Sequence, residues 1–174
     1  QVLNRVGLPL SRGFVRLEPQ QEFIDFPDIN VRNEPPLFGR LHCAAKLVAL
    51  KAVGAGYPLR GNLRVASAVG VADQVTRDIP AVGEAWVDAP LLDALGLRLG
   101  DKVLLGDTSL TLSRVVVIEP DRGAGFMNFA PRVLINQADV AASGLVQPAS
   151  RVGYRLAVAG QEAAVASYVQ WADA

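Results

Sequence analysis

Residues 83–119 read GEAWVDAPLLDALGLRLGDKVLLGDTSLTLSRVVVIE, and they contain the clearest structural signals of the chain. The segment from Glu84 to Asp88 has a short apolar run, Ala85-Trp-Val87, between two acidic residues and is predicted to be a β-strand. Asp88 followed by Ala89 and Pro90 predicts the start of a helix, because proline's missing N–H costs nothing in a first turn. Gly96 predicts the end of that helix.

A β-hairpin is predicted directly after this helix. Its first strand covers residues 102–105, and Gly106-Asp107 is a turn signal. The second strand covers residues 109–118, where the pattern alternates through Leu110, Leu112, Val115 and Val117, and Pro120 ends it.

Outside this stretch the pattern alternates between short strands and short helices. We predict strands at residues 47–53, 64–68, 132–135 and 151–158, and helices at residues 136–142 and 161–172. Residues 1–46 contain five prolines and indicate only short strands and turns.

Composition excludes several classes of protein. The 174 residues suit one domain, or one domain with an insertion, and 17 Lys and Arg balance 17 Asp and Glu. No cluster of basic residues suggests nucleic acid as a partner. One His and one Cys are too few for the usual zinc site, so we expect no metal. No apolar stretch reaches 18 residues, because charged side chains interrupt each one.

We expect neither a cofactor nor a catalytic residue. Gly54-Ala-Gly56 resembles the start of a dinucleotide motif, but Leu59 occupies the place of its third glycine. His42 and Cys43 are adjacent, so on a strand they would point to opposite faces and could not act as base and nucleophile.

Two aspartate pairs, Asp88 with Asp93 and Asp101 with Asp107, offer carboxylates for acid–base chemistry. Each has a simpler interpretation. Asp88 is placed to cap a helix, Asp93 falls on that helix's polar face, and the other two follow glycines in turns.

The glycine-rich segment 121–131 is a candidate contact loop. It combines Asp121 and Arg122 with Phe126 and Phe129, and Arg and aromatic residues are the side chains that most often anchor partners. In the alternative interpretation the two phenylalanines fold onto the core and Asp121 pairs with Arg122 or Arg132. The sequence leaves both interpretations open.

Eight short motifs, taken in their order along the chain, resemble one family. They are LVALKAV (47–53), GYPLRG (56–61), PAVGEAWVD (80–88), LLDALGL (91–97), LGD (99–101), EPDRG (119–123), APRVL (130–134) and SRVGYR (150–155). Together they resemble the first large extracytoplasmic domain of MacB/FtsX-type ABC-transporter permeases, in the YbbP-like branch, whose members are associated with lysophospholipase. The resemblance covers about residues 47–160. In residues 1–46 only Phe26-Pro27 is similar to the family.

The resemblance implies a fold of class α+β, a porter-like mixed α/β layer with a smaller, mostly β insertion. The layer would contain residues 1–53 and 130–174, and the insertion residues 54–129. The whole chain would be one extracytoplasmic region between the first two transmembrane helices, at the outer face of the cytoplasmic membrane, periplasmic in a Gram-negative organism. The chain begins with Gln1, which agrees with a piece of a longer protein.

The leading hypothesis is a non-catalytic permease domain that couples the transport cycle to a hydrophobic or lipid-like cargo, a lipoprotein or a periplasmic partner. Its partners would be the transmembrane part of the permease and a cytoplasmic ATPase subunit. The contact residues would be Tyr57 and Arg60 in one surface loop, and Asp121, Arg122, Phe126 and Phe129 in the other. The alternatives are a small hydrolase using Asp121 or Asp88, and a β-rich binding module built on the hairpin of residues 99–118.

Overall fold

The computed structural model describes residues 20–33, 44–122, 130–148, 150 and 152–172. The chain divides into a larger unit, Gln21–Ala157, and a smaller one that joins Gln1–Gln20 to Val158–Ala174. The strands are β1 (Gln20–Asn33), β2 (Ala45–Val53), β3 (Leu63–Ala66), β4 (Gln74–Thr76), β5 (Glu84–Val87), β6 (Lys102–Leu105), β7 (Thr108–Ile118), β8 (Arg132–Asn136) and β9 (Gly153–Val158). The helices are α2 (Ala89–Leu95), the short 3-10 turn η2 (Gln137–Asp139), α3 (Val140–Ser143) and α4 (Glu162–Ala172).

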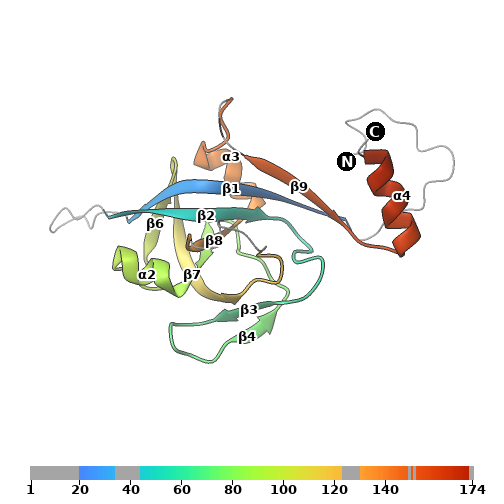
Figure 1. Ribbon diagram of the computed structural model, residues 1–174. Helices are drawn as coiled ribbons and strands as arrows, with labels where there is room; N and C mark the ends of the chain where they lie inside the picture. Colours follow the sequence, from blue (N-terminus) through green and yellow to red (C-terminus); the bar gives the residue numbers. More distant parts are fainter. Residues whose placement is uncertain (1–19, 34–43, 123–129, 149, 151, 173–174) are drawn as a thin grey trace. The chain divides into compact units, whose positions relative to one another are not determined.

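Six strands of the larger unit form a closed barrel (Figure 1). Their order is β7-β5-β8-β2-β1-β6, and β6 pairs with β7 to complete the ring. Two of the pairings, β5 with β7 and β2 with β8, are parallel, and the other four are antiparallel. β3 joins β7 outside the ring, and β4 extends that arm by one more strand.

The predicted fold class, an α+β porter-like layer with a mostly β insertion, is wrong, because the structure is mostly β and built around this barrel. The barrel strands come from both sides of the predicted boundary: β2 and β8 from the expected layer, and β5, β6 and β7 from the expected insertion. Apolar alternation identifies a strand and its buried face, but it does not say which other strand will pair with it. The division of the chain at residues 54 and 129 remains a prediction.

The local elements of residues 83–119 are confirmed. Helix α2 follows β5 directly and ends at Gly96, which adopts a left-handed conformation with φ of 64°. The helix buries three leucines, Leu91, Leu92 and Leu95, each of which contributes about 1.5–3 kcal/mol by leaving water. The expected β6–β7 hairpin also forms, with Leu105 opposite Thr108 across its turn.

Adjacent residues of a barrel strand contribute to two different hydrophobic clusters. Val133 and Ile135 of β8 lie in the main core, whereas Leu134 between them lies in a second cluster with Val53 and Trp86. This alternation follows from the pleat, which points successive side chains to opposite faces of a sheet. The second cluster therefore lies on the other face of the barrel wall from the main core, and the charged residues described below adjoin it.

In the smaller unit, the structure describes α4. None of its residues is buried, and its Tyr168 and Trp171 rings lie 5.6 Å apart between centroids. Among the helices that the structure describes, none is long and apolar enough to cross a membrane.

Candidate functional site

Two neighbouring strands place cations on the same face of the barrel wall. The side chain of Lys51 on β2 points to the opposite face from its neighbour Ala52, which lies in the main core. Its backbone is paired with that of Leu134, which belongs to the second cluster. Arg132 lies two residues before Leu134 and so points to the same face. Lys51 is only 1% exposed, and a lysine is almost never buried to this degree without a paired charge.

Glu119, just after the end of β7, supplies the negative charge between these cations. Its Oε1 lies 2.6 Å from Lys51 Nζ, and its Oε2 accepts a hydrogen bond of 2.8 Å from Arg132 Nε. The Glu119 side chain is fully closed to solvent. Both carboxylate oxygens are thus paired, as a buried charge requires.

Tyr57 closes the cluster over Lys51. Its hydroxyl lies within hydrogen-bond distance of Glu119 Oε1, at 3.0 Å, and of an oxygen of Asp121. Lys51 Nζ donates to the Tyr57 hydroxyl at 3.3 Å and to Asp121 Oδ2 at 3.1 Å. Burial in the first place, and then the nearby Glu119 carboxylate, raise the pKa of Tyr57, because both disfavour the phenolate.

A second ion pair connects Asp88 with Arg122. Arg122 donates to Asp88 Oδ2 at 2.8 Å, and the backbone N–H of Arg132 donates to the same oxygen at 3.0 Å. Asp88 occupies the N-cap position of α2, as predicted, but its side chain makes no capping hydrogen bond. The predicted capping role is therefore wrong, because the carboxylate is already bound to Arg122 and β8.

These residues form what we call the ion cluster: Lys51, Tyr57, Asp88, Glu119, Asp121, Arg122 and Arg132. Its three cations and three carboxylates balance, and every carboxylate contacts at least one cation. The cluster attaches the segment 119–122 to β2, to β8 and to the start of α2. Breaking a buried ion pair is costly, so this attachment holds the end of β7 against the barrel wall.

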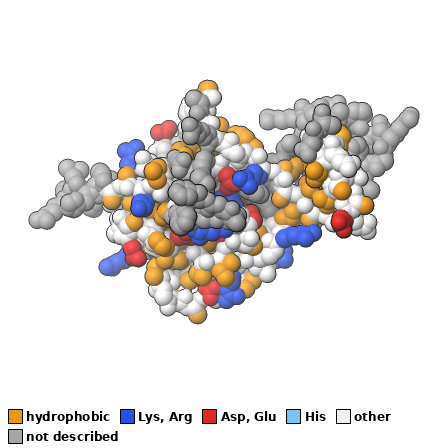
Figure 2. All heavy atoms as spheres, in the orientation of Figure 1, with side chains coloured by type: hydrophobic (Ala, Val, Ile, Leu, Met, Phe, Trp, Pro, Cys, Tyr) orange, Lys and Arg blue, Asp and Glu red, His pale blue; other side chains and the backbone are white. Residues whose placement is uncertain are grey.

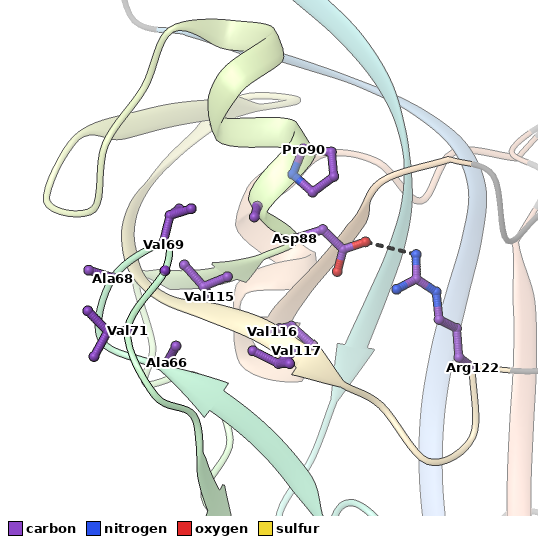
Figure 3. A pocket seen from close by; sticks show the side chains of 12 residues that line it. Ala66, Ala68, Val69, Val71, Asp88, Pro90, Val115, Val116, Val117 and Arg122 are labelled. Carbon is purple, nitrogen blue, oxygen red and sulfur yellow. Dashed lines mark hydrogen bonds and ion pairs between the residues drawn. The ribbon is translucent and has the colours of Figure 1, made fainter.

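A pocket of about 510 Å³ lies beside the Asp88–Arg122 pair (Figure 3). Its walls are aliphatic: Ala66, Ala68, Val69, Gly70 and Val71 from β3 and the loop after it, Ala89 and Pro90 from α2, and Val115, Val116 and Val117 from β7. Figure 2 shows hydrophobic side chains at the surface over the β3–β4 arm. Asp88 and Arg122 are the charged residues of the lining.

The structure distributes the predicted contact residues unevenly. Arg60 is exposed, as a contact residue needs to be, but Tyr57 of the same loop is 1% exposed and belongs to the ion cluster. The Asp121 and Arg122 side chains are about one third exposed. Asp121 pairs with Lys51 rather than with Arg122 or Arg132. Phe126 and Phe129 lie outside the described residues, as do His42 and Cys43.

Sequence reasoning missed Lys51, Glu119 and Arg132 as parts of one site. One signal was present: Lys51 interrupts the apolar run of residues 47–53, and a charge inside a buried strand needs a partner. Its partner lies 68 positions away, and only the folded barrel brings the two together. Within the described part of the chain, no group of His, Cys, Asp and Glu residues could hold a metal ion.

No protein-family model matches the chain. It is 34% identical over 126 residues, 72% of its length, to the uncharacterized ABC transporter permease YbbP of Escherichia coli (strain K12). This match spans 15% of YbbP. A crystallised domain assigned to a permease protein of Porphyromonas gingivalis shares the fold, with a TM-score of 0.53 and 8% identity over 93% of this chain and 72% of that one.

The sequence similarity identifies the class of protein to which the chain belongs: it is a domain of an ABC-transporter permease. Within that class it is related to YbbP, as the order of the eight short motifs predicts. The structural similarity, at 8% identity, adds agreement on the fold alone.

Proposed function

We propose that this chain is a non-catalytic extracytoplasmic domain of its permease and couples the transport cycle to a hydrophobic or lipid-like cargo or to a partner protein. The rest of the permease would carry the transmembrane helices, and a separate cytoplasmic subunit would hydrolyse ATP. The domain would lie at the outer face of the cytoplasmic membrane. The similarity to YbbP supports the class, and the structure supports a mechanical role.

The ion cluster is the observation that carries this proposal. It joins β2, β8, the start of α2 and the segment after β7 through buried and partly buried charge-assisted hydrogen bonds. A domain that transmits movement must not dissipate it by internal deformation, and a closed barrel with such cross-links is stiff because breaking any buried pair is costly. The exposed Arg60 and the pocket beside Arg122 then move as parts of one body with the barrel.

The hydrolase alternative has less support. Asp88 is bound to Arg122 and to the backbone of β8, and Asp121 is bound to Lys51 and Tyr57. A general acid or base must be free to exchange a proton with a substrate, and both carboxylates already hydrogen-bond to other groups of the domain.

Membrane sidedness is tested with a thiol at an exposed position. In the full permease, Val82→Cys is introduced into a background in which Cys43, the one cysteine of these 174 residues, and any cysteine elsewhere in the permease are replaced by serine; Val82 is 66% exposed in a turn. A membrane-impermeant maleimide applied to intact cells should label this variant, as it should a control cysteine in a known extracytoplasmic loop of another protein. Labelling only after the cells are lysed would contradict the proposed location.

Coupling is tested at Arg60. Arg60→Glu reverses a charge on an exposed side chain, so the melting temperature of the domain should stay the same while transport by the full permease with its ATPase falls. Arg77→Glu, also exposed, is the matched control and should leave transport unchanged. Equal transport by the Arg60→Glu and Arg77→Glu variants would show that Arg60 is not part of the contact surface. Asp121 and Arg122 are poorer test positions, because their substitution would also disturb the ion cluster.

A further inference from the structure

The pocket beside the ion cluster is apolar at one end and polar at the other. Figure 3 shows Val69, Val71 and Ala68 toward one end and the paired Asp88 and Arg122 toward the other. Its volume of about 510 Å³ lies in the range of small-molecule sites. A pocket with aliphatic walls and one polar end suits a ligand with a hydrocarbon body and one polar head.

The polar end has an unused acceptor. Asp88 is 7% exposed, and its Oδ1 has no hydrogen-bond partner in the described structure, although Oδ2 accepts two hydrogen bonds. A buried carboxylate oxygen without a donor is energetically unfavourable, because it has lost its hydrogen bonds to water. Arg122, one third exposed beside it, uses its Nη2 for Asp88 and has further N–H groups on the guanidinium.

We propose that this pocket binds an uncharged amphiphile, a molecule with an aliphatic chain and a head that carries hydroxyl groups. A hydroxyl can donate to Asp88 Oδ1 and accept from Arg122 at the same time. Oδ1 is enclosed in this structure, so binding requires the neighbouring side chains to move enough to admit the hydroxyl. The aliphatic chain then lies along Val69, Val71, Val115 and Val117.

The charge of the site favours an uncharged head. Asp88 and Arg122 together have no net charge, so an anionic head would meet the Asp88 carboxylate and a cationic head would meet the guanidinium. Either charge would be taken partly out of water without a partner of its own, which is costly. A hydroxyl avoids this penalty and leaves the ion pair intact.

The pocket continues into exposed apolar surface. Val69, Val71 and Val117 of its walls are each about half exposed, at 54%, 52% and 48%. Exposed apolar patches that adjoin a pocket are typical of ligand-binding grooves. A hydrocarbon chain would cover this surface.

The experiment compares three probes with the same eight-carbon body: 1-octanoylglycerol, octanoate and octylamine. Each is titrated, below the concentration at which it aggregates, into the chain with isotope-labelled valine methyl groups. With 1-octanoylglycerol we expect saturable chemical-shift changes of the Val69, Val71, Val115 and Val117 methyl groups. The two charged probes should bind at least about tenfold more weakly. No saturable shift with any probe would overturn the site, and tighter binding of octanoate or octylamine would overturn the uncharged head.

Two variants locate the binding. Val71→Asp puts a charge on the pocket wall and should weaken binding about tenfold or more, whereas Val82→Asp, a comparably exposed valine outside the lining, should not. Equal loss in both would contradict the location. The biological meaning of this ligand site rests on the proposed cargo-coupling function, but the site and that function are tested by separate experiments. Failure of the probes to bind would leave the thiol-labelling and Arg60 results unaffected, and cytoplasmic labelling would leave the binding result unaffected.

Discussion

Lys51 Nζ lies 2.6 Å from Glu119 Oε1, and both side chains are almost completely closed to solvent. The two residues come from strands that are not neighbours in the barrel, since Lys51 is in β2 and Glu119 follows β7. Their contact, together with Arg132 and Asp121, connects segments that are remote in sequence. The stability of the domain should therefore depend on individual members of the cluster.

Lys51→Met should destabilise the domain by about 3–5 kcal/mol, because it leaves Glu119 and Asp121 with too little positive charge in a buried site. Urea denaturation followed by circular dichroism measures this loss. Lys46→Met on the same strand is the control, since Lys46 is exposed and its loss should change stability by no more than about 0.5 kcal/mol. Similar losses in the two variants would show that the cluster does not stabilise the fold.

Tyr57 should resist ionisation in the folded protein, because burial and the Glu119 carboxylate raise its pKa above the ordinary value of 10.0. The folded state then keeps its proton while the unfolded state loses it, so stability is fully present below pH 10.0 and falls as the pH rises above it. Ultraviolet absorbance should show one of the three tyrosines ionising only on unfolding.

The control for this titration is a pair of phenylalanine variants. Tyr57→Phe should remove the late-ionising tyrosine, whereas Tyr154→Phe, at a position 69% exposed, should remove a normal one. Ionisation of all three tyrosines in the folded wild type near pH 10.0 would contradict the buried position of Tyr57.

Gly106→Ala should cost more stability than Gly96→Ala. Both glycines adopt left-handed conformations, with φ of 57° and 64°, so alanine costs about 1–2 kcal/mol at either site. A Cβ on Gly106 would also lie 2.0 Å from the Ser143 carbonyl oxygen, whereas one on Gly96 would meet nothing within 4 Å. We expect about 1–3 kcal/mol of additional loss at Gly106, measured by thermal unfolding. Equal losses would mean that the hairpin turn does not pack against α3.

Asp73 should titrate below the usual range of an aspartate. A hydrogen bond from Arg64 lowers the pKa of Asp73, because the guanidinium favours the charged carboxylate. This pair joins β3 to the loop before β4, and its contribution is present at neutral pH and lost as the pH falls through the Asp73 pKa. Carbon-detected NMR titration measures that pKa, and Arg64→Gln should return it toward the ordinary range. An unchanged pKa in Arg64→Gln would exclude this ion pair as the cause.

The sequence was informative wherever a structure depends on neighbouring residues. The helix between Asp88 and Gly96 and the hairpin at Gly106-Asp107 were predictable, because proline, glycine and the apolar period act within a few residues. The resemblance to YbbP-like permeases was also predictable from the order of short motifs, and the comparison confirmed it. The α+β layer was wrong because it required strand partners that no local pattern specifies.

The candidate site shows the same limit. Arg60, Asp121 and Arg122 were visible as polar residues in loops, but the ion-pair partners of Asp121 and Arg122 were not. Asp88 was interpreted as a helix cap, since that role is local, whereas its actual partners lie 34 and 44 positions further along the chain. A carboxylate binds the strongest hydrogen-bond donor within its reach. For Asp88 the tertiary structure supplies a guanidinium, which binds a carboxylate more strongly than the N–H groups of the helix do.

By itself, the sequence determined the strand, helix and hairpin of residues 83–119 and the class of protein, because each depends on residue types and spacing along the chain. It did not reveal that residues 20–33 form one long strand, since only short strands and turns were expected there. Only the tertiary structure decided that six strands close into a barrel, that Tyr57 is buried, and that Lys51 meets Glu119. The physical reason is that charges and strand edges are satisfied by whichever partner the fold brings near. Distance in space sets those energies, and distance along the chain does not.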